Sequence, residues 1–330
     1  MKVPILSLLY TTTLLFALNA LVYGQARLLP VTKNGSCGYL DRTGKIIIPL
    51  QFDRCWKFSE GFASVTTDGK QGFIDEKGVY LAAPQFDAYW YFTTFQEGFA
   101  PVCLRGSYEK WGFIDTAGRV TYLPEVTLLG TFHEGLAFFK KGDRAGYVNR
   151  ELKIVIAPNF KSAGHFYNGR ARVIDLDGSS FYIDKSGQKV FANREGSDFQ
   201  NGLAFFKSNN KYGFLNTNGE IVLAPQYDFA QFFGDGLANV CVGEKWGFID
   251  VTGQFVIPPQ FDDAGEFSEG LARVAKGGKW GFIDKTGKVV IPFQFDKWTS
   301  WFEGGICEVH LNNKMGYIDK TGKYIWEPTN

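Results

Sequence analysis

The sequence has few histidines and cysteines and no excess of charge of either sign. Its three histidines, His133, His165 and His310, are far apart, and none has a second histidine or cysteine at a metal-ligand spacing. Zinc binding and general-base catalysis by histidine are therefore unsupported. No CxxC pair occurs, which leaves zinc ribbons and thioredoxin-like motifs without support. The net charge is +1 with no basic stripe, so the electrostatic signature of nucleic-acid binding is absent.

Only the N-terminus contains a long apolar run. Lys2 is followed by the uncharged stretch 3–23 and by the small residues Gly24-Gln25-Ala26. This order predicts a secretory signal peptide over residues 1–26, cleaved after Gly24 or Ala26. The alternative is an uncleaved anchor, because the stretch is just long enough to span a bilayer. We expect an exported protein of the periplasm, the cell envelope or the extracellular space.

The rest of the chain is rich in aromatic residues and in turn formers. Aromatic residues make up 17% of the sequence, and there are 39 glycines and 12 prolines. This composition indicates a folded chain of short β-strands rather than a disordered or helical one.

Residues 27–330 consist of nine repeated units of about 34 residues. One core of the unit is a glycine followed by an aromatic residue, an aliphatic residue and Asp or Asn. It recurs at Gly38, Gly72, Gly112, Gly146, Gly213, Gly247, Gly281 and Gly316, with Phe181 in place of the glycine in the fifth unit. A second anchor, a glycine that opens the first strand, recurs at Gly61, Gly98, Gly135, Gly169, Gly202, Gly236, Gly270 and Gly305.

Each unit is predicted to be a three-stranded meander. In the eighth unit, Leu271–Lys276 and Lys279–Asp284 form a hairpin. The turn that follows Asp284 leads into a third strand over Lys288–Ile291, which Pro292 ends. The segment 294–305 is then a looser connection to the next unit.

The middle strand is apolar or bare on both faces, because Trp280 and Phe282 alternate with Gly281 and Ile283. Each sheet should therefore lie between two others, with Gly281 allowing a neighbouring layer to approach. We predict an all-β, open and curved solenoid. The alternative is a closed propeller-like ring, which we disfavour because propeller blades usually need about 40 residues for four strands.

Three units carry the same five residues, Trp111–Asp115, Trp246–Asp250 and Trp280–Asp284. With the Pro-x-x-Phe-Asp and Glu-Gly-Leu-Ala elements, the chain resembles the WG-repeat family over its whole length after the N-terminal segment. The positions that carry the motif are Trp111, Gly112, Asp115, Trp246, Gly247, Asp250, Trp280, Gly281 and Asp284. The resemblance implies a bacterial, often exported interaction module without catalytic residues. The tryptophan is replaced at Cys37, Gln71, Ala145, Ser180, Tyr212 and Met315, and the turn glycine at Leu152.

Two sets of acidic residues follow the repeat. The first is Asp41, Asp75, Asp115, Asp184, Asp250, Asp284 and Asp319, completed by Asn149 and Asn216; the second is Asp53, Asp87, Asp228, Asp262 and Asp296. Periodic carboxylates can bind calcium, but several oxygens must converge. The first set matches the sequence rules of turns, so we assign it a structural role and predict no metal or cofactor.

The five cysteines are odd in number, so at least one is unpaired. A disulfide between Cys37 and Cys55 is plausible because both lie in the first unit. Cys103 and Cys241 hold one repeat position four units apart, and an open array does not join them. Cys307 replaces the small residue Ala272 of the eighth unit, which indicates a buried thiol.

Aromatic residues that the repeat does not require lie in the connecting segments, at Trp56, Tyr89, Trp90, Tyr91, Trp298 and Trp301. Insertions in the second unit lie near 89–91 and 105–108, and extra residues in repeat proteins map to loops that often bind. Either these side chains form a surface for a protein or glycan, or they pack the connection onto the sheets.

We predict a monomeric, non-catalytic protein-interaction or scaffolding module, whose partner is a protein or an envelope polysaccharide. The alternative is a lectin-like glycan-binding module that uses the loop aromatics. A weaker alternative is an unrecognised hydrolase, for which no nucleophile, base and orienting group occur together.

Overall fold

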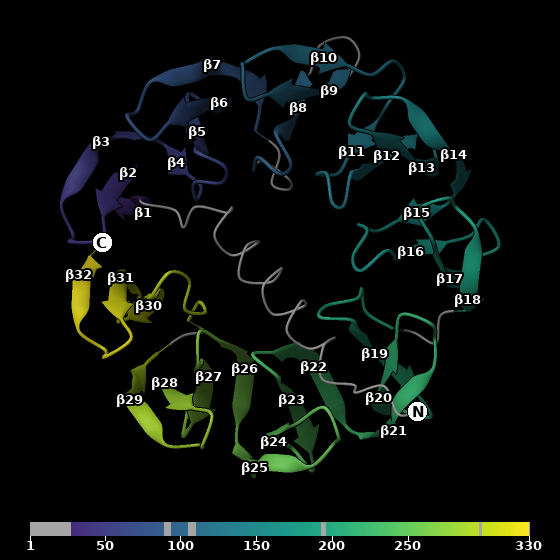
Figure 1. The fold of residues 1–330 in the computed structure, drawn as a ribbon. Helices are drawn as coiled ribbons and strands as arrows, with labels where there is room; N and C mark the ends of the chain where they lie inside the picture. The colour runs from purple at the N-terminus through teal and green to yellow at the C-terminus, as the bar shows by residue number, and fades with distance from the viewer. Residues whose placement is uncertain (1–27, 89–93, 105–109, 193–195, 297–298, 330) are drawn as a thin grey trace, which may run out of the picture.

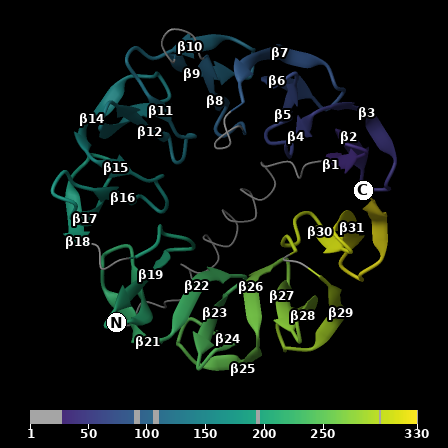
Figure 2. The ribbon, with the colours of Figure 1, turned by 180° about the vertical axis from the view of Figure 1, so that it is seen from behind.

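The computed structural model describes residues 28–88, 94–104, 110–192, 196–296 and 299–329. In this part of the chain the strands form nine small antiparallel sheets. The sheets follow one another around an axis and close into a ring, a nine-bladed β-propeller (Figures 1 and 2). We number the blades one to nine in chain order. None of the described residues belongs to a helix long and apolar enough to cross a membrane.

Each blade contains three or four short strands in sequential order. Blades one to three contain β1 (Leu28–Lys33), β2 (Ser36–Asp41) and β3 (Ile46–Phe52); β4 (Arg54–Cys55), β5 (Phe62–Thr67), β6 (Lys70–Asp75) and β7 (Tyr80–Asp87); and β8 (Phe99–Leu104), β9 (Lys110–Asp115) and β10 (Val120–Tyr122). Blades four to six contain β11 (Leu128–Leu129), β12 (Leu136–Lys141), β13 (Arg144–Asn149) and β14 (Ile154–Phe160); β15 (Ser162–Ala163), β16 (Ala171–Ile174), β17 (Ser180–Ile183) and β18 (Lys189–Ala192); and β19 (Leu203–Ser208), β20 (Lys211–Asn216) and β21 (Ile221–Tyr227). Blades seven to nine contain β22 (Phe229–Gly234), β23 (Leu237–Val242), β24 (Lys245–Ile249) and β25 (Phe255–Phe261); β26 (Asp263–Ser268), β27 (Leu271–Lys276), β28 (Lys279–Asp284) and β29 (Val289–Phe295); and β30 (Ile306–Leu311), β31 (Lys314–Asp319) and β32 (Tyr324–Thr329).

The prediction of an open solenoid is wrong, and among the described residues five of the nine units have four strands rather than the expected three. The segment expected to be a loose connection forms a fourth strand, such as β22 or β26, at the inner end of its sheet (Figure 1). Where this inner strand is short or irregular, single bridges such as Gln96↔Phe99 and Glu303↔Ile306 hold the segment in place. About 34 residues therefore suffice for a blade, because its strands are short and its turns tight.

The ring closes through the same interface that joins every other pair of blades. In blade eight, Ile283 packs with Phe248 of the preceding blade. The equivalent residue of blade one is Leu40, which is 0% exposed although only blade nine can cover that side. The backbone of the turn at Gly44 lies so close to the Ile325 carbonyl of blade nine that an added Cβ would be 2.3 Å from its oxygen. The first and last sheets therefore cover each other.

Polar contacts across the junction of blades nine and one repeat those found elsewhere in the ring. The Tyr147 hydroxyl donates to the Gly164 carbonyl of the next blade at 2.8 Å, and the Tyr317 hydroxyl donates to the Pro30 carbonyl of blade one at 2.7 Å. Arg42 of blade one donates to the Gly304 carbonyl of blade nine. No exchange of strands between the chain ends is needed among the described residues, because each contact is a copy of an ordinary blade-to-blade contact.

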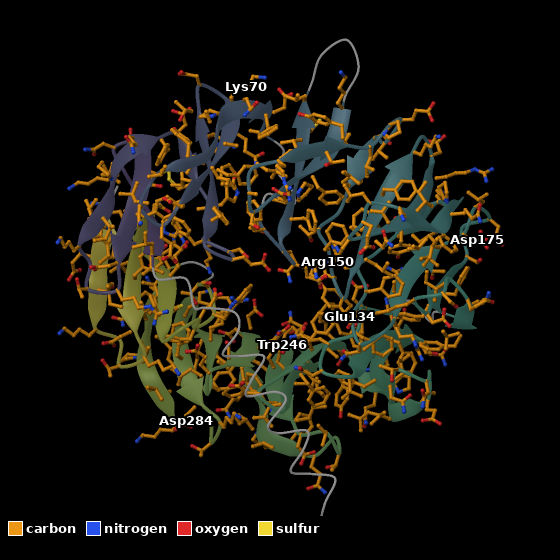
Figure 3. The ribbon with its side chains drawn as sticks, turned by 45° about the horizontal axis from the view of Figure 1, so that its top comes forward. Lys70, Glu134, Arg150, Asp175, Trp246 and Asp284 are labelled. Atoms are coloured by element: carbon orange, nitrogen blue, oxygen red, sulfur yellow. A yellow bond between two sulfur atoms is a disulfide. The ribbon has the colours of Figure 1, made fainter. Side chains whose placement is uncertain are left out.

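Acidic residues in the turn between the inner and second strands also link the blades. Glu60 accepts hydrogen bonds from the backbone N–H groups of Glu97 and Gly98 at 2.8 and 2.7 Å. Glu97 accepts from Gly135, Glu134 from Gly169, Asp235 from Gly270 and Glu269 from Gly305. Glu134 lies beside the middle of the ring in Figure 3, whereas Lys70 and Asp175 lie at its outside. These carboxylates therefore link the inner ends of successive blades by hydrogen bonds.

Cys37 and Cys55 form a disulfide between β2 of blade one and β4 of blade two. The acidic turn that links other blades would fall before Leu28 in blade one, outside the described residues. The disulfide thus joins a pair of blades for which no acidic-turn contact is described. Cys103 and Cys307 are buried thiols, and Cys307 donates to the carbonyls of Ser300 and Glu308 at 3.3 Å.

The glycine of the repeat core faces the backbone of its own sheet, not a neighbouring layer as expected. An added Cβ at Gly281 would lie 2.6 Å from the Ile291 carbonyl oxygen. The outer strand β29 continues past Pro292, and its register shifts where Trp280 pairs with Phe295 and Phe282 with Ile291. Proline is tolerated there because the outer strand is an edge with a bulge.

The fifth unit supports this explanation from within the chain. Its Phe181 replaces the glycine, and the outer strand β18 covers only Lys189–Ala192, with no proline. Phe181 pairs with Ala192 and Ile183 with Lys189, so the larger bulge seen in blade eight is absent in this described pair. In blade five the glycine and the proline bulge are thus lost together, whereas blade three keeps Gly112 beside a short outer strand whose described pairs show no bulge.

We predict that Gly281→Ala destabilises the protein by about 1–3 kcal/mol, because the methyl group and the Ile291 carbonyl cannot both keep their places. Urea denaturation measures this change. The control is Gly277→Asn, since Asn312 holds the same hairpin position in blade nine at a φ of 53°. It should change stability by less than about 0.5 kcal/mol. A Gly281→Ala protein as stable as the control would refute the explanation.

Candidate functional site

The repeated acids serve the turns and the blade contacts. The Asp284 carboxylate accepts hydrogen bonds from the Thr286 N–H at 2.9 Å, the Thr286 hydroxyl at 2.6 Å and the Lys288 N–H at 3.1 Å. The Thr286 hydroxyl holds the pKa of Asp284 below its usual range. Asp41, Asp250 and Asp319 make the same contacts, and the Asn216 oxygen accepts the corresponding N–H groups.

The second acidic set connects neighbouring blades on the hairpin side. Asp262 accepts from Lys245 of its own unit at 2.6 Å and from the Gly277 N–H of the next hairpin at 2.7 Å. Asp228 repeats this arrangement with Lys211 and Gly243. Among the residues that the structure describes, no three His, Cys, Asp or Glu side chains gather as a metal site would require.

One repeat position combines a constant residue with a variable neighbour. The constant residue is a buried phenylalanine of the inner segment, present at Phe58, Phe95, Phe132, Phe166, Phe199, Phe233, Phe267 and Phe302. The residue directly before the phenylalanine differs between blades in charge, size and polarity. It is Lys57, Thr94, Thr131, His165, Asp198, Phe232, Glu266 or Trp301. The phenylalanine is required for packing, whereas nothing in the repeat fixes its neighbour. We call the variable residue the inner variable position.

Three of these variable residues lie around one hollow at the inner side of blades six to nine. The hollow has a volume of about 540 Å³, and its lining includes Phe232, Glu266 and Trp301. Several of its lining residues belong to the inner strands β22 and β26, whose place in the ring is seen in Figure 1. The remaining lining residues are Gln200, Asn201, Gln231, Gly234, Asp235, Phe267, Ser268 and Arg273. We call this feature the inner hollow.

The inner hollow contains one acidic and one basic side chain that are both partly withdrawn from water. Burial raises the pKa of Glu266, and the Gln200 amide lies 3.5 Å from its carboxylate. Burial lowers the pKa of Arg273, which donates to the Thr299 carbonyl at 2.5 Å. Asp235 is already engaged, since its carboxylate accepts from Gly270. The charges of Glu266 and Arg273 offset each other, and Asp235 leaves the lining with one further negative charge.

The tryptophans of the repeat core and those of the connecting segments have different surroundings. Trp111 is 2% exposed, and Trp246 and Trp280 pack against the apolar clusters between blades. Figure 3 shows Trp246 within the sheet region. Of the proposed binding residues, Trp301 is 51% exposed and lines the inner hollow, while Trp56 is half-buried in blade two. Tyr89, Trp90, Tyr91 and Trp298 lie outside the described residues.

A second surface runs around the outside of the ring. The first two residues of an outer strand point to opposite faces of the sheet, and both are exposed because the blades spread apart away from the axis. The exposed apolar residues at these two positions include Ile46, Ile47, Tyr80, Ile154, Val155, Val190, Ile221, Val222, Phe255, Val256, Val289 and Val290, and Tyr122, the third residue of β10, is exposed as well. We call this surface the outer rim.

The outer rim is hollowed at blade three. Its outer strand β10 has three residues, whereas those of blades four, six, seven and eight have seven. A recess of about 720 Å³ lies beside it, lined mostly by apolar groups from Tyr122, Leu123, Pro124 and Val126. We call it the outer recess.

The structure also brings together two histidines that the sequence left apart. The rings of His133 and His165 are 4.3 Å apart between blades four and five, and Tyr167 packs on His133 at 4.9 Å. Burial lowers the pKa of His165 to about 4. The pair is neutral at pH 7, so it packs as aromatic side chains do.

Sequence reasoning identified Trp301 but missed Glu266, Gln231 and Arg273 in the inner hollow and Tyr122 in the outer recess. The sequence does contain a signal for Glu266, because this residue occupies the inner variable position. The hollow itself combines side chains from four blades, and no local pattern shows which blades face it.

Comparison with known proteins gives one match in sequence and several in shape. The profile described as "WG containing repeat" matches residues 38–70, 72–108, 111–144, 146–175, 195–212, 212–246, 246–280 and 280–314. None of the curated proteins matches the chain.

Solved structures similar to the chain include BamB from Moraxella catarrhalis, at 10% identity and a TM-score of 0.42, covering 91% of this chain and 98% of that one. AztD from Citrobacter koseri has 16% identity and a TM-score of 0.42, covering 80% and 90%. Hsv2p from Kluyveromyces lactis has 9% identity and a TM-score of 0.39, covering 68% and 89%.

Proposed function

Because the chain belongs to the WG containing repeat family, we propose that it is a non-catalytic scaffold that binds protein partners on its outer rim. The exposed apolar pairs of the outer strands are the observation that carries this proposal. Exposed apolar surface of this extent is typical of protein–protein contacts.

The repeated structure of the rim fits a scaffold. Several outer strands present the same kind of apolar pair, so a partner can engage more than one blade at once. The outer recess adds a concave site for one larger apolar side chain, since its volume and lining match those of ligand pockets. The repeated acids, in contrast, are committed to turns and blade contacts and are not placed for chemistry.

The proposal is tested by comparing what the full chain and two variants retain from an envelope extract. The rim variant is Tyr122→Thr, Ile154→Thr and Val155→Thr, which keeps β-forming residues but removes apolar area. The control is Val242→Thr and Val251→Thr, which changes exposed apolar residues outside the outer strands. Proteins retained by the unmodified chain should fall about tenfold on the rim variant only. Equal retention by the two variants would contradict a role for the rim.

We also propose that the protein works outside the cytoplasm. The residues 1–26 have the pattern of a signal peptide, and the Cys37–Cys55 disulfide is of a kind that persists in oxidising compartments. Expression of the full chain in a bacterial host should therefore give a periplasmic or secreted protein that begins at Gln25 or Arg27. Mass spectrometry of the purified protein decides this, and a cytoplasmic product with free Cys37 and Cys55 would contradict it.

A further inference from the structure

We infer that the inner hollow is a binding site for a neutral sugar residue of a glycan. This site lies on the inner side of the ring and is separate from the outer rim, so it goes beyond the scaffold proposed above. The two can succeed or fail independently.

The inner hollow departs from the repeat. A purely structural position in nine similar blades is expected to keep similar residues, as the buried phenylalanine does from Phe58 to Phe302. The inner variable position instead supplies Phe232, Glu266 and Trp301 to one hollow from three successive blades. Packing does not ask for an exposed indole or a half-buried carboxylate there. A ligand is the physical reason that remains.

The lining of the hollow carries polar groups of several kinds. Gln200 and Gln231 offer amide donors and acceptors, Glu266 an acceptor and Arg273 a donor, all on one hollow. Hydroxyl groups both donate and accept, so a sugar ring satisfies such a mixed set. The Arg273 guanidinium offsets the Glu266 carboxylate, and the second carboxylate, that of Asp235, already accepts from Gly270, so the lining does not call for a ligand with net charge. The volume of about 540 Å³ is that of a small-molecule site.

Part of the lining is held in position by a buried residue behind it. Asn239 is 0% exposed and donates its amide to the Gln231 oxygen at 2.7 Å and to the Ala264 carbonyl at 2.7 Å. This hydrogen bond fixes the orientation of the Gln231 amide. Because its oxygen is occupied by Asn239, the amide nitrogen is the group that can donate to a ligand. Asn239 is thus a positioning residue, whose burial is explained by the orientation it gives to Gln231.

Trp301 supplies an aromatic face to the hollow. Trp301 is 51% exposed and lines the hollow, so its indole is accessible to a ligand there. The face of an indole packs well on the C–H face of a sugar ring, while the amides and the carboxylate take the hydroxyl groups. Trp301 also lines a small cavity with Lys57 of blade two and Glu303, so the site adjoins the junction of blades nine and one.

Isothermal titration of the full chain with cellotetraose, maltotetraose, mannotetraose and chitotetraose tests the site. At least one of these neutral oligosaccharides should bind saturably. Trp301→Ala and Gln231→Leu should each weaken that binding at least tenfold, and Asn239→Leu should weaken it too if Asn239 orients Gln231. Thermal denaturation of each variant shows whether it is folded. If Asn239→Leu, at a buried position, does not fold, Gln231→Leu, at a half-exposed side chain, still tests the site.

The matched control is His165→Thr. It changes the inner variable position of blade five, away from the hollow, to the residue found at Thr94 and Thr131. This variant should bind as the unmodified chain does. Absence of saturable binding to all four oligosaccharides, or unchanged binding by Trp301→Ala, overturns the proposal. Binding of a peptide in the hollow, blocked by Trp301→Ala while no oligosaccharide binds, also overturns it in favour of a protein ligand. If the rim variant no longer retains protein partners, that result concerns the outer rim and does not bear on the sugar site.

Discussion

Each sheet of this protein is apolar on both faces, and the rest of the structure depends on covering both. The strand directly before the outer strand has the burial pattern of an interior strand, as in β9 and β13, where four successive residues are buried. Such a sheet is stable only between two others. An open row would leave one face of the first blade and one of the last in water. The ring removes both exposed faces, and the nearly complete burial of Leu40 and Tyr317 follows from it.

The same constraint explains the sequence of the repeat. The core glycine is needed because the bulged outer strand passes over it, the acidic turns tie the inner ends of the blades, and the inner phenylalanine fills the space near the axis. Residues under these constraints are similar in unit after unit. These constraints do not apply to the inner variable position or to the first residues of the outer strands. Residues that bind a ligand can therefore occupy those positions without destabilising the fold.

The sequence was sufficient to predict the parts of the fold that follow local rules. The strands Leu271–Lys276 and Lys279–Asp284 and the turn after Asp284 are present as expected, because hairpin and turn geometry depends on a few adjacent residues. The inner strand was missed, since Asp263–Ser268 contains glycine and charged residues that are not typical of a strand. Closure was missed because it depends on contacts between residues nearly 300 positions apart, such as Tyr317 and Pro30.

The candidate sites show the same division. Trp301 could be identified because it stands out from the repeat, but its companions Glu266 and Arg273 are ordinary polar residues in the sequence and become a site only when blades six to nine face one hollow. The outer recess depends on the short strand β10, whose early end the sequence pattern did not reveal.

Closure of the ring is the central claim, and zero-length cross-linking tests it most directly. A carbodiimide joins an amine to a carboxylate only when the two are in contact. The Nζ atom of Lys57 in blade two lies 3.0 Å from the carboxylate of Glu303 in blade nine, so this ion pair spans the junction where the ring closes. The two side chains are 45% and 58% exposed. Lys70 and Asp87, 2.8 Å apart within blade two, are the internal control. Mass spectrometry of the monomer, prepared from mixed light and heavy isotope-labelled chains, should find the Lys57–Glu303 link within single chains. A Lys70–Asp87 link without it, or a Lys57–Glu303 link only between chains, would contradict the closed ring.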